Sequence, residues 1–146
     1  MPVSRHLSIW GIIAVAVIVF AVEQSRETSF GDSGGVIPTQ VRAAASALVE
    51  GRLSFEGVQA FSTLVTSMFL HGDVEHILFN MVFLWTFGIL SSELLGQWRA
   101  LAVFIFCGIC GAIIHICLNP DSSVPMIGAS GAVCGFEGVY LGLALR

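Results

Sequence analysis

The 146-residue sequence has no lysine and few charged residues of any kind. Asp, Glu, Lys and Arg make up 11% of the chain, against roughly 25% in soluble domains. A small soluble chain keeps much of its surface in water, so this composition excludes an ordinary soluble globule. The net charge of −4 argues against nucleic acid as a partner, because such proteins carry a basic patch. Without lysine, a catalytic Ser–Lys dyad is impossible.

Apolar residues take the place of the missing charge. They make up 55% of the chain, and the mean hydropathy is +0.88, which also excludes a disordered chain. The sequence therefore predicts an all-α integral membrane protein that lies in a lipid bilayer. A membrane helix needs roughly 17–25 mostly apolar residues, and four stretches come close: 7–22, 76–95, 100–118 and 128–145. They form one transmembrane domain over residues 1–146, with a long polar loop at 23–60 in which 41–53 predicts a short helix.

The first stretch has two interpretations. Arg5 and His6 followed by residues 7–22 resemble a secretory signal peptide, but no A-x-A cleavage site follows, so a retained span is favoured. With four spans, the arginines near the span ends, Arg5, Arg99 and Arg146, fall on one side. The positive-inside rule then predicts a cytoplasmic N-terminus.

Metal and redox chemistry receive little support. Cys107 and Cys110 have the C-x-x-C spacing of a redox or metal pair, but no second pair accompanies them. We therefore interpret these two cysteines, and Cys117 and Cys134 of the last two stretches, as small apolar residues of membrane helices. His71 and His76 are five residues apart, not the four of an H-E-x-x-H zinc motif, so no metal site is predicted.

Polar residues within the spans suggest a reaction centre, because such groups are costly in lipid. His76 and Asn80 are four residues apart and share a helix face. On their own they are better explained as an interhelical hydrogen-bond clamp. Ser130 falls in the first turn of the last predicted helix, between Gly128 and Gly131. Unpaired N–H groups there would stabilise an oxyanion after serine attack, although serine is also an ordinary helix cap.

A stripe of glycines continues down the same helix. Gly131, Gly135, Gly138 and Gly142 follow one another at steps of four, three and four residues. Small residues at this spacing let a neighbouring membrane helix approach closely. The third stretch offers only Gly108, Gly111 and Ala112 in return, so we expect the partner helix to lie outside this sequence.

The ordered motifs of residues 60–145 resemble those of the rhomboid intramembrane serine proteases in their bacterial form. The matching strings are Thr66-Ser67-Met68-Phe69-Leu70-His71-Gly72, His76-x-x-x-Asn80-Met81, Phe83-Leu84-Trp85-Thr86-Phe87-Gly88, Glu93-x-x-Gly96 and Pro125-x-x-Gly128-Ala129-Ser130-Gly131-Ala132. The first 60 residues agree only in kind.

The resemblance implies a rhomboid-like core of six helices that cleaves membrane proteins in or near a transmembrane helix. Ser130 is then the nucleophile, and His76 and Asn80 stabilise the oxyanion, with His71, Gly128 and Gly131 supporting the site. The family uses no metal or organic cofactor. A bacterial inner membrane is the implied location. The oligomeric state is left open.

The chain departs from this family in two places. The family's general base is a histidine in an A-H-x-x-G string on the sixth helix, and none of the four histidines lies in one. We therefore expect the last two core helices to be absent from these 146 residues, and the isolated chain to be inactive. Substitution by His115 is disfavoured. Glu137 stands where the family has an apolar residue, and is either a neutral acid bonded to a neighbouring helix or part of a water or proton path.

A second function stays open. Inactive members of the rhomboid superfamily bind client transmembrane helices without cutting them. The joint presence of Ser130, His76 and Asn80 argues against this alternative, because a binder has no chemical need for all three.

Overall fold

The computed structural model describes residues 6–25 and 34–145, and this part of the chain is helical. The elements in chain order are α1 (Leu7–Ser25), α3 (Pro38–Val49), α4 (Phe55–Thr66), the short turn η2 (Ser67–Phe69), α5 (Val74–Phe83), the π-helical turn η3 (Leu84–Gly88), α6 (Ile89–Leu95), α7 (Gln97–Leu118) and α8 (Ser130–Ala144). No strand occurs in the described residues beyond a single bridge between Val36 and Met126. The all-α prediction is confirmed.

Three helical segments are long and apolar enough to cross a membrane. They are α1, the continuous helix from α5 through η3 to α6, and α7. The fourth predicted span, 128–145, is helical over the 15 residues of α8. Fifteen residues rise about 22 Å, less than the roughly 30 Å of a hydrocarbon core, so α8 as a full span stays a prediction.

The helix ends differ from the predicted ends for local reasons. The second helix begins at Val74 and not at 76, because the Asp73 carboxylate caps it by accepting from the His76 N–H at 2.7 Å. The third helix begins at Gln97 and not at 100, because Gly96, with φ +82°, ends the preceding helix and the next one starts directly after it. The fourth begins at Ser130 and not at 128, because Gly128 has φ +116°.

The region predicted as a loop, 23–60, contains more helix than expected. The short helix predicted at 41–53 is α3, which starts at Pro38 and stops before Gly51, where φ is +75°. A second helix, α4, follows after the Ser54 hydroxyl caps it by accepting from the Gly57 N–H, and runs past the predicted end of the loop. Both pack on the end of α7 through a small apolar cluster that includes Ala60 and Ile116.

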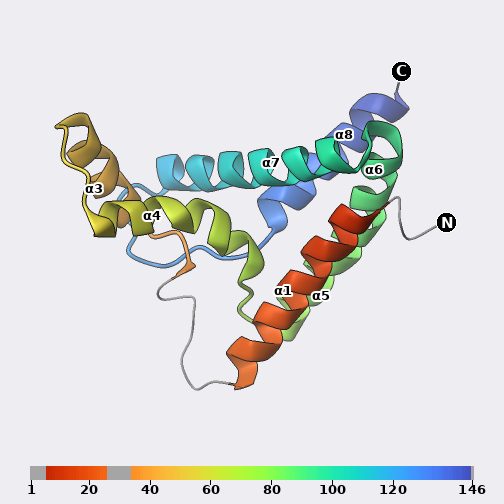
Figure 1. Ribbon diagram of the computed structural model, residues 1–146, viewed down its shortest axis with the longest axis horizontal. Helices are drawn as coiled ribbons and strands as arrows, with labels where there is room; N and C mark the ends of the chain where they lie inside the picture. The colour runs from red at the N-terminus through yellow and green to blue at the C-terminus, as the bar shows by residue number, and fades with distance from the viewer. Residues whose placement is uncertain (1–5, 26–33, 146) are drawn as a thin grey trace.

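The helices share one end of the molecule. In Figure 1, α1 begins, α6 ends, α7 begins and α8 ends at the same side, and α3 and α4 lie at the opposite side. Arg99, in the first turn of α7, belongs to the first of these ends. Arg5 and Arg146, the other arginines of the predicted cytoplasmic side, lie outside the described residues.

Helix α1 is an integral part of the core. Ile9 and Ala16 are buried in one apolar cluster with Leu84 of η3, Phe104 of α7 and Phe136 of α8. Gly88 lets α1 approach, because a Cβ there would lie 3.2 Å from Ile9 Cδ1. This packing favours the retained span over the cleavable signal peptide.

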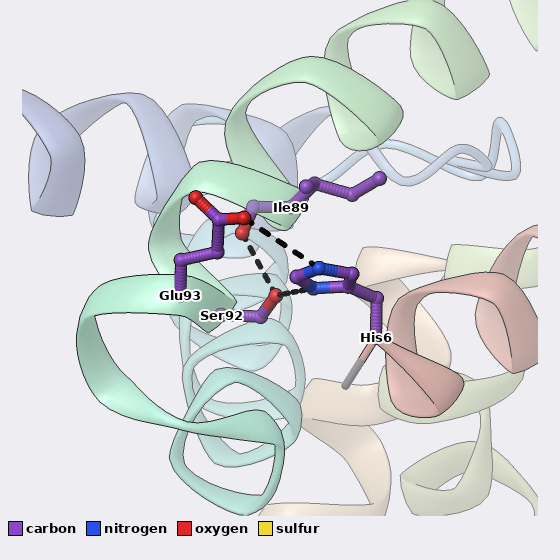
Figure 2. Close-up of polar contacts among 4 residues, drawn as sticks. All are labelled: His6, Ile89, Ser92 and Glu93. Carbon is purple, nitrogen blue, oxygen red and sulfur yellow. Dashed lines mark hydrogen bonds and ion pairs between the residues drawn. The ribbon is translucent and has the colours of Figure 1, made fainter. Parts of the chain in front are cut away.

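A buried polar contact joins the start of α1 to the end of α6 (Figure 2). His6 Nδ1 lies 2.7 Å from Ser92 Oγ, and His6 Nε2 lies 3.7 Å from Glu93 Oε1. The Ser92 hydroxyl donates its one hydrogen to the Ile89 carbonyl at 2.8 Å. Ser92 Oγ must therefore accept from His6, which places a hydrogen on Nδ1.

We expect Ser92→Ala to lower the free energy of unfolding by about 1–3 kcal/mol, because His6 Nδ1 would be left buried without its acceptor. Unfolding in detergent micelles measures the change. Ser62→Ala is the control, since it removes only an exposed bond to the Gln59 carbonyl within α4. Equal stability of the two variants would contradict an anchoring role for the His6 contact.

Candidate active site

The segment before α8 fixes where the helix begins. The Gly128 N–H donates to the Ser67 carbonyl at 2.8 Å, and Met126 exchanges backbone hydrogen bonds with Val36 at 2.8 and 2.9 Å. Gly128 then turns with φ +116°, a conformation that disfavours any residue with a Cβ. As a result Ser130 is the first residue of α8, and its side chain is exposed.

Glycines hold α8 against α7. A Cβ on Gly131 would lie 3.3 Å from the Gly111 Cα, and one on Gly135 would collide with the Cys107 side chain. The expectation that the glycine stripe meets a helix outside the sequence is therefore wrong for its first half, because α7 is the partner there. At Gly138 and Gly142 an added Cβ would meet nothing within 4 Å among the described residues, so this half of the stripe is open.

Helix α5 presents His76 and Asn80 toward α8. The Asp73 cap positions the first turn, in which His76 lies. Asn80 is buried, and its amide donates to the His76 carbonyl one turn earlier at 2.9 Å. A second hydrogen of that amide stays free for another acceptor.

Three of the predicted site residues, Ser130, His76 and Asn80, line one cavity of about 300 Å³, which we call the Ser130 cavity; His71, Gly128 and Gly131 are not among its lining residues. From α5 it is lined by His76, Phe79, Asn80 and Phe83, and from α8 by Ser130, Val133, Cys134 and Glu137. Each set has the i, i+3, i+4, i+7 spacing of one helix face. The structure thus brings Ser130, His76 and Asn80 together, and adds Glu137.

The close approach of His76 to the start of α8 depends on a glycine. A Cβ built on Gly128 would lie 2.5 Å from His76 Nε2 and 2.8 Å from Cε1. Gly128 therefore has two reasons to lack a side chain: its positive φ and the histidine ring above it. The flanking glycines have different roles, since Gly131 meets α7 and Gly128 meets His76.

His71 lies directly behind His76. The two rings meet edge to face, with centroids 5.1 Å apart. His71 is buried, and neither ring nitrogen has a hydrogen-bond partner in the described part of the chain. Burial, together with the neighbouring His76, lowers the pKa of His71 to about 4, so its ring is neutral at pH 7. The neutral ring of His71 therefore packs against the ring of His76, which lines the Ser130 cavity.

Ser130 also touches a second cavity, of about 270 Å³, on the α7 side of the helix. His115, the histidine considered as a substitute base, lines this second cavity and is absent from the lining of the Ser130 cavity. His76 and His115 thus line two different cavities, and Ser130 lines both.

Sequence reasoning missed the walls of the Ser130 cavity. Phe79 and Phe83 lie three and seven residues after His76, and Val133 and Cys134 lie three and four after Ser130. This spacing could have identified them from the sequence, because residues three, four and seven positions apart lie on one face of a helix. Cys134 was expected to be only apolar filling of a helix. Cys107 does fill such a place, above Gly135, and all four cysteines are free.

Comparison with known proteins assigns most of these motifs to one family. A family model described as the Rhomboid domain matches residues 58–146. Rhomboid protease GluP of Bacillus subtilis (strain 168) is 35% identical over 82 residues, which cover 56% of this chain and 16% of that protein. Putative rhomboid protease YdcA of the same organism is 38% identical over 82 residues, or 56% of this chain and 41% of that protein.

A plant relative matches a longer stretch. RHOMBOID-like protein 5 of Arabidopsis thaliana is 30% identical over 108 residues, which cover 74% of this chain and 33% of that protein. The chain thus spans well under half the length of each of these relatives.

We expect Gly128→Ala to lower the free energy of unfolding by about 1–3 kcal/mol, because alanine is strained at φ +116° and its Cβ collides with the His76 ring. Gly138→Ala in α8 is the matched control, since its Cβ meets nothing within 4 Å. In a helix interior that change should be neutral or stabilise by up to about 1 kcal/mol. Chemical unfolding in micelles compares the two. A neutral Gly128→Ala would show that the His76 contact imposes no constraint.

His71 predicts a pH dependence of stability. Its pKa is about 4 in the folded protein and returns toward 6.5 on unfolding, so the unfolded chain binds more protons between these values. The free energy of unfolding should therefore fall as the pH drops from 6.5 toward 4, by up to about 3 kcal/mol. His71→Phe should remove this component and His115→Phe should retain it, as unfolding at pH 7, 5.5 and 4.5 would show. An unchanged pH profile in His71→Phe contradicts the assignment.

Proposed function

From the membership of this chain in the rhomboid family, we propose that it is part of an intramembrane serine endopeptidase. One observation carries the proposal: Ser130, His76 and Asn80 line the same cavity. Its substrates are membrane proteins, cut in or near a transmembrane helix. The reaction needs no metal or organic cofactor, because each role falls to a side chain or a backbone N–H.

The chemistry follows from the start of α8. Ser130 Oγ attacks the scissile carbonyl carbon, and the carbonyl oxygen becomes negative. Backbone N–H groups of the first turn of a helix lack intrahelical partners and favour negative charge. The free hydrogen of the Asn80 amide and the His76 ring add donors from the opposite wall of the cavity. Donors preorganised in this way stabilise the transition state more than the substrate.

The serine also needs a general base. None of the four histidines lies in the A-H-x-x-G string that the family uses for this purpose. His76 belongs to the oxyanion pocket in this proposal, and His115 lies on the other side of α8. We therefore expect residues 1–146 by themselves not to turn over substrate, and the full gene product to supply the base.

The proposed location is a bacterial inner membrane with the N-terminus in the cytoplasm. The start of α7, which carries Arg99, lies at the same end of the molecule as the start of α1 (Figure 1). Arginine in a short connection favours the cytoplasmic side. The Ser130 cavity begins at the opposite end of α8 from this connection, so the site opens toward the outer half of the membrane.

A fluorophosphonate probe tests the proposed function. The full gene product in liposomes should be labelled on Ser130, and Ser130→Ala should abolish labelling. Asn80→Ala should slow labelling by about 10²–10³-fold, because one oxyanion donor is lost. Ser91→Ala is the matched control, since its hydroxyl contacts the Phe136 carbonyl outside this cavity.

Two outcomes would overturn parts of the proposal. A full gene product that is neither labelled nor cleaves any reconstituted transmembrane reporter is a client-binding member of the family and no protease. Labelling of the isolated 146-residue chain on Ser130 would contradict the need for a base outside it.

A further inference from the structure

The segment 119–129 joins α7 to α8 and ends directly before Ser130. It contains no helix and a single bridged residue, Met126. In Figure 1 it runs from the end of α7 past α3 to the start of α8. The backbone groups of such a segment have no helix or sheet to pair with, so contacts with other parts of the chain must hold it in place. These contacts therefore determine where α8 begins.

Backbone hydrogen bonds from residues 36–39 hold one side of this segment. Met126 exchanges two of them with Val36, and the Thr39 N–H donates to the Ser122 carbonyl at 3.2 Å. Thr39 lies in the first turn of α3, where N–H groups have no partner within the helix. The start of α3 thus uses one of its free donors to bind the segment before Ser130.

Arg42 of α3 adds a side-chain contact to these backbone contacts. Its Nη1 donates to the Pro120 carbonyl at 2.9 Å and to Asp121 Oδ1 at 3.1 Å. Both acceptors lie just beyond the end of α7 at Leu118. A cation is favoured at that end of a helix, because the last carbonyl groups carry partial negative charge. Arg42 therefore holds the turn at which the chain leaves α7.

Of the two acceptors, the Pro120 carbonyl matters more for the course of the chain. Arg42 and Asp121 are both exposed in the described residues, and an exposed ion pair contributes little to the stability of a fold. The Pro120 carbonyl belongs to the backbone of the segment, so a donor bound to it restrains the path of the chain. We therefore expect Arg42 to affect the position of the segment more than the free energy of unfolding.

We infer that Arg42 is a positioning residue of the proposed reaction, which holds the segment before α8 so that Ser130 stays opposite the α5 wall of its cavity. This inference rests on the proposed function, since it assumes that Ser130 attacks the substrate. The glycine contact with α7 limits how closely and in which rotation α8 packs. A tether on the preceding segment also restrains a shift of α8 along its own axis.

The restraint reaches the serine through a series of anchored residues. After Pro120 the anchored residues are Ser122, Met126 and Gly128, whose N–H donates to the Ser67 carbonyl, and Ser130 follows two positions later. Because these anchors are closely spaced, a displacement at Pro120 is passed along the segment. The remaining anchors also limit that displacement when Arg42 is lost, so its loss should shift Ser130 only slightly.

Labelling kinetics of the full gene product in liposomes test this assignment. Arg42→Ala should slow fluorophosphonate labelling of Ser130 by about three- to tenfold, less than the roughly hundredfold that a 1 Å misplacement can cost. For a transmembrane reporter, kcat should fall by the same factor and KM should stay within about twofold of wild type, since substrate binding is not altered. The fraction of molecules finally labelled should match wild type, because alanine is well tolerated at an exposed helix position.

Arg52→Ala is the matched control. It removes the same side chain and an exposed ion pair, but the partner of Arg52 is Glu50, two residues earlier and outside the segment 119–129. This variant should be labelled at the wild-type rate. Arg42→Lys keeps a donor for the Pro120 carbonyl, so its labelling rate should lie closer to wild type than that of Arg42→Ala.

The results separate the two proposals. If Arg42→Ala is labelled at the wild-type rate, the positioning role of Arg42 is overturned and the protease function stands. The same holds if Arg42→Ala lowers only the labelled fraction, because this indicates a loss of folded protein, or if Arg42→Lys is as slow as Arg42→Ala, because a missing donor is then not the cause. If wild type is neither labelled nor active on any reporter, the protease function itself fails.

Discussion

The backbone contact between α7 and α8 determines where the serine stands. In a membrane, helices gain no hydrophobic free energy by associating, so they pack where small residues let their backbones approach. Here a Cβ on Gly131 would come within 3.3 Å of the Gly111 Cα, and one on Gly135 would collide with Cys107. Gly131 directly follows Ser130. A methyl group at either glycine would push α8 away from α7 and carry the serine with it, so the position of Ser130 is set by the absence of side chains on the helix face beside it.

The second constraint is the hydrogen bonding of the buried polar groups. Away from the cavity some are paired: His6 Nδ1 donates to the Ser92 hydroxyl, and the Thr63 hydroxyl donates to the Ala60 carbonyl. Others, His6 Nε2 and the Ser8 hydroxyl, have no hydrogen-bond partner in the described residues. At the cavity His71 is buried behind His76 without a hydrogen-bond partner for either ring nitrogen in the described residues. Unpaired polar groups are costly in a protein interior and persist where surrounding structure holds them. The structure holds the buried His71 ring against His76, which lines the Ser130 cavity.

From the sequence, the fold class and three residues that line the Ser130 cavity could be predicted. The apolar residues that form the walls of this cavity were missed. Ser130, His76 and Asn80 were singled out because each is a polar residue in an apolar helix, and the resemblance of the ordered motifs to one family implied their roles. The helix α4 was missed because its apolar residues alternate with polar ones and are too few in sequence to form a membrane span, while its packing against α7 is a tertiary contact. The π-turn at Leu84–Gly88 has no composition signal, since it arises where α1 packs close to Gly88. The helix that packs on the first half of the glycine stripe was predicted wrongly. The spacing of the glycines shows that some helix approaches, but only the tertiary contacts show that this helix is α7.

The Ser130 cavity is built from two helix faces, one on α5 and one on α8. Both faces of the Ser130 cavity repeat at i, i+3, i+4 and i+7, with the reacting groups at the first turn and Glu137 two turns on. Each residue adds about 100° of helical rotation, so a rotation of α8 by one residue would remove Ser130 and Glu137 from the cavity together. The glycine contact with α7 fixes that rotation for both. The Glu137 carboxyl and the Ser130 hydroxyl are therefore held at a fixed spacing along one wall of the cavity, and any change in the α7 contact moves both groups together.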